Sequence, residues 1–81
     1  MGEPKQEVPV DVRMQIVERN IAVAMQQIFD CSINIEAANL GAKDDKDTPE
    51  ATRLRVLAAD WIKKRDYFQG KMKELEAEKT K

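Results

Sequence analysis

Residues 10–38 read VDVRMQIVERNIAVAMQQIFDCSINIEAA, and this stretch decides the fold. Its apolar side chains recur at alternating steps of four and three residues from Val10 to Ala38. A heptad that continues over such a length is typical of a helix that packs along its whole length against another helix. Residues 29–35 also alternate apolar and polar side chains, as a strand would. Because the heptad runs through them without a skip, we predict a helix there as well.

A second heptad occupies the other half of the chain. Its apolar positions run from Ala51 to Leu75 in steps of three and four, with Arg65 as the one charged member. Leu57 and Ile62 flank this stripe and are expected to widen its core-facing surface. Residues 48–50, Thr-Pro-Glu, have the features of a helix start. The threonine hydroxyl can accept from free backbone N–H groups, proline fixes φ, and glutamate meets the positive end of the helix dipole.

The ends of the chain and the segment between the heptads are polar. Gly41 is a plausible C-terminal cap for the first helix, because glycine tolerates the left-handed conformation that often ends a helix. The expected organisation is a flexible N-terminal lead at 1–8 and one helical domain at 9–81, with helices at about 9–40 and 48–78 and a loop at about 41–47.

A short loop makes neighbouring helices antiparallel. When the chain is folded so that Ala38 faces Ala51, each seam residue of the first helix meets a seam residue of the second, with no slip over eight layers. Two heptads that were read independently therefore agree in register. We predict an all-α, coiled-coil-like antiparallel hairpin, whose seam contains Met14, Val17, Ile21, Ile28, Cys31, Ile35, Leu54, Ala58, Trp61, Phe68, Met72 and Leu75.

The first helix has more apolar surface than the second can cover. A lone two-helix hairpin has little core to offset the entropy lost on folding, and large exposed apolar patches favour association. We therefore expect a second copy or another protein to cover this face, with a homodimer in a four-helix bundle as the simplest closed arrangement. The predicted interface residues are Val12, Ile16, Val23, Phe29, Ile33 and Leu40.

Composition argues against a catalytic or metal-binding role. The chain has no histidine and one cysteine, so imidazole catalysis and the usual zinc sites are excluded. The acidic cluster of Asp44, Asp45 and Asp47 lacks the spacing of a calcium-binding loop and is interleaved with lysines, so we interpret it as a solvated loop. We predict a non-catalytic interaction module without cofactor, metal or small-molecule ligand.

The alternative function is a nucleic-acid-binding regulator. Residues 1–52 carry five basic and ten acidic side chains, whereas residues 53–81 carry nine basic and five acidic ones. Phosphate binding requires basic groups on one face, but those of the second half are spread around the expected helix and interrupted by acids, which disfavours this alternative. The candidate contacts are Lys63, Lys64, Arg65, Lys71 and Lys73. No stretch is apolar enough to be a membrane span or a secretion signal, so a cytoplasmic location is expected.

Overall fold

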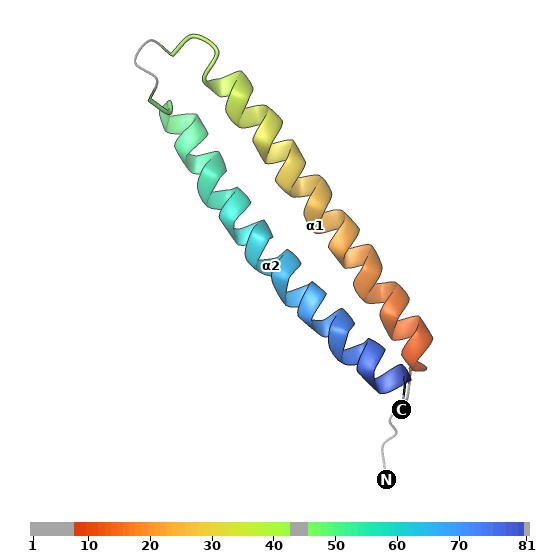
Figure 1. Cartoon of the computed structure of the whole chain (residues 1–81). Helices are drawn as coiled ribbons and strands as arrows, with labels where there is room; N and C mark the ends of the chain where they lie inside the picture. The colour runs from red at the N-terminus through yellow and green to blue at the C-terminus, as the bar shows by residue number, and fades with distance from the viewer. Residues whose placement is uncertain (1–7, 43–45, 81) are drawn as a thin grey trace.

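The computed structural model describes residues 8–42 and 46–80, and in these residues it contains two α-helices and no strand. Helix α1 comprises Val10–Ala38 and helix α2 comprises Pro49–Lys79. The helices lie side by side and run in opposite directions, with the connecting segment at one end of the hairpin (Figure 1). The predicted all-α antiparallel hairpin is confirmed, including a helix over residues 29–35. Residues 1–7 of the predicted lead, together with Asp44 and Asp45, lie outside the described residues.

The start of α2 is built as the sequence predicts. The backbone N–H of Ala51 donates to the side-chain oxygen of Thr48 at 3.2 Å, Pro49 is the first helical residue, and Glu50 lies in the first turn. The side-chain cap satisfies one of the N–H groups that have no partner within the helix. Thr48 is therefore the N-cap of α2, and this prediction is confirmed.

The predicted glycine cap of α1 is wrong. The helix ends at Ala38, and Asn39 is the C-cap residue, with φ −94° and ψ 4°. The backbone N–H of Asn39 donates to the carbonyl oxygens of Ile35 and Glu36, which tightens the last turn before the chain reaches Gly41. The helix is therefore terminated by a residue whose side chain is anchored across the loop, and a left-handed glycine is not needed.

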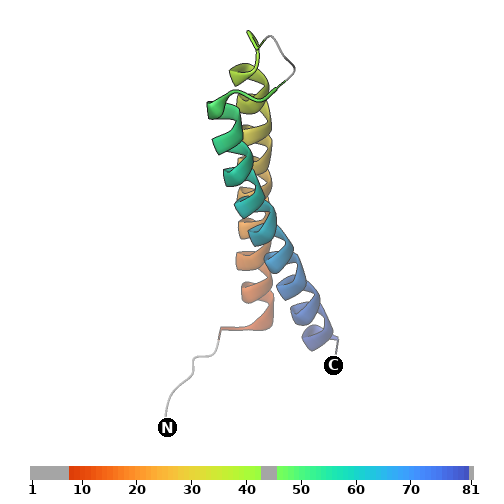
Figure 2. The ribbon, with the colours of Figure 1, turned by 90° about the vertical axis from the view of Figure 1, so that its left-hand side faces the viewer.

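The hairpin has a narrow core because each helix is covered on one side only. Among the described residues, only Ala24, Cys31, Ala51 and Leu75 are buried. Two of these are alanines, so the backbones can approach closely at these layers, while the larger seam side chains stay half-buried at the edges of the contact. The two helices cross at a shallow angle (Figure 2).

Two ion pairs join the helices at the end away from the loop. Arg13 Nη2 lies 2.6 Å from Glu78 Oε1, and Lys79 Nζ lies 2.9 Å from Asp11 Oδ1. The predicted register places Arg13 opposite Glu76 and Asp11 opposite Glu78, so each observed partner lies within two positions of the predicted one. All four side chains are at least 41% exposed, so these pairs contribute little stability. Within the described residues, neither helix contains a segment long and apolar enough to cross a bilayer.

Candidate interaction surface

None of the predicted seam residues is fully exposed. Cys31 is 2% exposed and Leu75 is 8% exposed, and the other ten are half-buried. Arg65, the charged member of the second heptad, is half-buried too. Its Nη2 lies 3.1 Å from Asp66 Oδ1 on the same helix, so the guanidinium turns out of the seam toward a neighbouring carboxylate.

The predicted interface residues all lie on the surface. Their exposed fractions range from 41% for Val12 to 82% for Leu40. Five belong to α1, whereas Leu40 follows in the turn after the helix. All six are exposed in the folded hairpin, so α1 retains apolar surface that α2 does not cover.

Most of these residues form a line along α1 on the side away from α2. From Val12 to Leu40, residues at alternating steps of four and three are all exposed. Within α1 this spacing keeps the residues on one helix face. Six of the nine members are apolar. We call this face the outer stripe; its residues are Val12, Ile16, Arg19, Val23, Gln26, Asp30, Ile33, Ala37 and Leu40.

Phe29 and Ala22 lie beside the outer stripe, on one edge of it. Phe29 is 67% exposed, the largest value of any apolar side chain within α1. On α2, Leu57 and Ile62 are 47% and 37% exposed, so the expectation that they widen the core-facing surface is wrong. With two helices in contact, positions next to the seam are at the rim of the interface and retain much of their exposure.

The five basic residues of the nucleic-acid alternative do not share one face. Lys63, Lys64 and Lys73 are exposed, and Lys64 Nζ lies 4.5 Å from the centroid of the Trp61 ring. Lys71 Nζ lies 3.3 Å from Glu74 Oε1, and Arg65 is paired with Asp66. Two of the five charges are thus already neutralised by carboxylates within α2.

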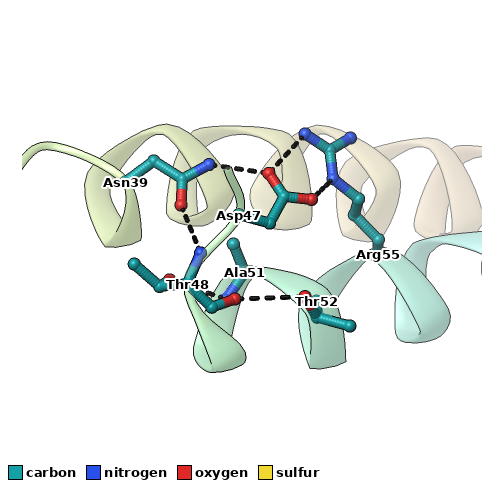
Figure 3. Close-up of polar contacts among 6 residues, drawn as sticks. All are labelled: Asn39, Asp47, Thr48, Ala51, Thr52 and Arg55. Carbon is teal, nitrogen blue, oxygen red and sulfur yellow. Dashed lines mark hydrogen bonds and ion pairs between the residues drawn. The ribbon is translucent and has the colours of Figure 1, made fainter. Parts of the chain in front are cut away.

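A polar cluster that the sequence analysis did not predict closes the loop end (Figure 3). Asn39 Nδ2 donates to Asp47 Oδ1 at 2.9 Å, while Asn39 Oδ1 accepts from the backbone N–H of Thr48 at 2.9 Å. Arg55 donates to both oxygens of Asp47, with its Nη2 3.1 Å from Oδ1. We call Asn39, Asp47, Thr48 and Arg55 the loop-end network. Asp47 is exposed, as expected of a solvated loop residue, and its side chain in addition ties the end of α1 to α2.

The loop-end network shifts the titration of its charged members. Hydrogen bonds from Arg55, and then from Asn39, hold the pKa of Asp47 below its usual value, because both donors favour the ionised carboxylate. The hydrogen bond between Arg55 and Asp47 also raises the pKa of Arg55. Since the folded-state pKa of Asp47 is depressed, its stabilising contribution is present above the unfolded value of about 4 and is lost as the pH falls through the folded value.

We expect the Asp47→Asn variant to unfold a few degrees below the wild type at neutral pH, because asparagine keeps the shape of the side chain but loses the charge that binds Arg55. The difference should shrink below about pH 4 and disappear in stronger acid, where Asp47 is protonated. Thermal unfolding followed by circular dichroism between neutral and strongly acidic pH measures this. The control is Asp60→Asn, which removes an exposed carboxylate outside the network. A constant difference at every pH would contradict the assigned role of Asp47.

The described part of the chain contains no group of three acidic or cysteine side chains arranged to hold a metal ion. Comparison with protein-family models, characterised proteins and solved structures finds no match to this chain. The outer stripe is the surface feature of the hairpin from which a function can be inferred.

Proposed function

We propose that this protein is a non-catalytic helical interaction module that self-associates through the outer stripe of α1. The observation that carries the proposal is the exposure of all nine stripe residues, six of them apolar: eight lie along α1, whose opposite face packs on α2, and Leu40 lies in the turn that follows. A continuous apolar stripe at heptad spacing is the surface that a second helix covers. Two hairpins joined in this way form a four-helix assembly with both copies of α1 inside.

A second copy is the favoured occupant because the stripe itself offers both signs of charge. Arg19 and Asp30 interrupt the apolar residues near the middle of α1, and neither has an ion-pair partner within the described residues. A partner surface must supply an acid and a base at these two places, and another α1 carries both. Association also enlarges a core that contains few buried side chains.

We expect the wild-type protein to be dimeric at micromolar concentration and Ile33→Glu to weaken the dimer by about a hundredfold or more. By symmetry the substitution places two carboxylates in the apolar interface of each dimer, where truncation of a central residue alone costs about 2 kcal/mol or more. Sedimentation equilibrium over a wide concentration range measures the dissociation constant, and circular dichroism checks that the hairpin remains helical.

The control is Val56→Glu, which introduces the same carboxylate at a 63% exposed aliphatic position on α2. This variant should dimerise as the wild type does, because α2 faces away from the proposed interface. A folded wild-type protein that stays monomeric at every concentration would overturn self-association. Equal effects of the two variants would move the interface away from the outer stripe.

A further inference from the structure

The outer stripe is self-complementary in one orientation. In an antiparallel pair of α1 helices, the two ends of the stripe exchange places, and eight of its nine members, from Val12 to Ala37, fall opposite one another; Leu40 falls opposite Pro9, just before the helix. Val12 then faces Ala37 of the second copy, and Ile16 faces Ile33. Nearer the centre, Arg19 faces Asp30 and Val23 faces Gln26, and the two-fold axis repeats every pair.

We propose that α1 binds α1 of a second copy in antiparallel orientation, with Arg19 of each copy paired with Asp30 of the other. This inference rests on the proposed self-association and specifies its geometry. The two central charges of the stripe become two intermolecular ion pairs, each with the Ile16–Ile33 layer on its outer side and the Val23–Gln26 layer on its inner side. The stripe therefore contains its own recognition signal, because charges at an otherwise apolar helix interface fix register and orientation.

Other arrangements leave these charges unsatisfied. A shift by one heptad in one direction places Arg19 against Val23 and Asp30 against Val12. The opposite shift places Arg19 against Ala37, so that in both cases a guanidinium faces apolar side chains without an acid. A charge that is removed from water without a partner is costly. Both shifts also shorten the overlap, whereas the proposed register uses almost the full 29 residues of α1.

Parallel pairing is excluded by the same two residues. In a parallel pair in register, Arg19 would face Arg19 and Asp30 would face Asp30. Like charges that face each other across a helix interface are destabilising, and the two-fold axis would place both repulsive pairs in every dimer. Only the antiparallel register places each charge against its opposite over the full helix.

Phe29 gains a partner in the same register. In the hairpin, residues at the edge of the seam meet a partner two positions beyond the one directly opposite. Arg13, for example, pairs with Glu78, although Glu76 lies directly opposite in the register. The equivalent edge of the proposed interface brings Phe29 over Ala22 of the second copy, a large side chain against a small one. Phe29, the most exposed of the large apolar side chains in α1, would thus be covered by a small residue that leaves room for its ring.

The geometry also determines the order of the helices. The outer stripe lies on the side of α1 away from α2, so the four helices follow the order α2, α1, α1, α2 across the dimer. Each α1 is covered on two sides, and each α2 keeps its charged outer surface in water. The exposed acids and bases of α2 therefore remain on the outside of the assembly.

Charge reversal tests this register. We expect Arg19→Asp and Asp30→Arg each to weaken the dimer by about tenfold or more, because each replaces two attractive pairs with two repulsive ones. The double variant Arg19→Asp/Asp30→Arg restores both pairs with their signs exchanged, and its dissociation constant should return to within about threefold of the wild-type value. Sedimentation equilibrium measures all four proteins. The matched controls are Arg53→Asp and Asp60→Arg, two reversals of exposed charge on α2, and these should leave the dissociation constant unchanged.

The outcomes separate the two proposals. A wild-type monomer would refute self-association together with the register. A dimer that is lost in Ile33→Glu but is not restored in the double charge variant would keep the interface and overturn the antiparallel register, since a parallel pair would still oppose like charges. A dimer that ignores all the charge reversals would likewise overturn the register. Helix content at 222 nm confirms in each case that the hairpin is folded.

Discussion

Cys31→Asp is expected to abolish the cooperative unfolding transition of the hairpin. Cys31 is 2% exposed and lies in the seam, opposite Ala58 in the predicted register, so a carboxylate there would be removed from water between two apolar positions. An unpartnered charge in such a place costs about 3–5 kcal/mol. A chain of this length has a total stability of only about 4–12 kcal/mol, so one substitution consumes much of it.

The matched control for Cys31→Asp is Ser32→Asp, one residue further along α1 at an exposed position. It introduces the same side chain with the same helix propensity, but it leaves the carboxylate in water. Circular dichroism during heating, at a fixed protein concentration, should show a normal transition for Ser32→Asp and little or none for Cys31→Asp. Similar melting curves for the two variants would mean that Cys31 is not enclosed between the helices.

The second large effect is expected from Leu75→Ala. Leu75 is 8% exposed, and it is the largest buried side chain in the described residues of α2, although it lies only one turn from the end of the helix. Truncation of a buried leucine removes its burial and leaves a cavity, at a cost of about 2–3 kcal/mol. For a domain of this size that corresponds to a fall of roughly 10–20 °C in the unfolding midpoint.

Glu76→Ala provides the comparison for Leu75→Ala. It also introduces alanine in the last turns of α2, but at an exposed position. Its midpoint should stay within a few degrees of the wild-type value, or rise slightly because alanine favours helix. If Leu75→Ala has an equally small effect, the end of the hairpin away from the loop does not hold Leu75 in the seam in solution.

Periodicity alone predicts most of this fold, because the hairpin is made of features that are local in sequence. The two heptads predict both helices and their antiparallel register, and the Thr48-Pro49-Glu50 segment predicts how α2 begins. Hydrophobic spacing repeats every turn, so it can be recognised without knowledge of the tertiary structure. The helix N-cap depends on residues three positions apart and is equally accessible.

The loop-end network could not be predicted in the same way. Its hydrogen bonds connect Asn39 with Asp47 and Asp47 with Arg55, which are separated by eight residues in each case. No helical or strand period brings such residues together, and they meet only once the chain has reversed direction. The sequence favours Gly41 over Asn39 as the cap of α1, because the hydrogen bond that fixes Asn39 comes from Thr48 across the loop and has no local signal.

The candidate interface was only partly recognisable from the sequence. The apolar pattern predicts Ile16 and Ile33 as interface residues. Arg19, Gln26 and Asp30 lie on the same helix face but are polar, so the apolar pattern does not include them. The structure shows that these polar residues share the exposed line. The order of apolar and charged positions along one face carries orientation information that a set of apolar residues does not contain.

The loop-end network also bears on how the hairpin assembles. Its side-chain bonds span eight residues, whereas the pair of Arg13 and Glu78 at the far end spans 65. The entropy lost on closing a loop increases with the length of chain enclosed. Nucleation at the turn, followed by zippering of the layers toward the termini, is therefore the least costly folding route, and the layers farthest from the loop are the last to form.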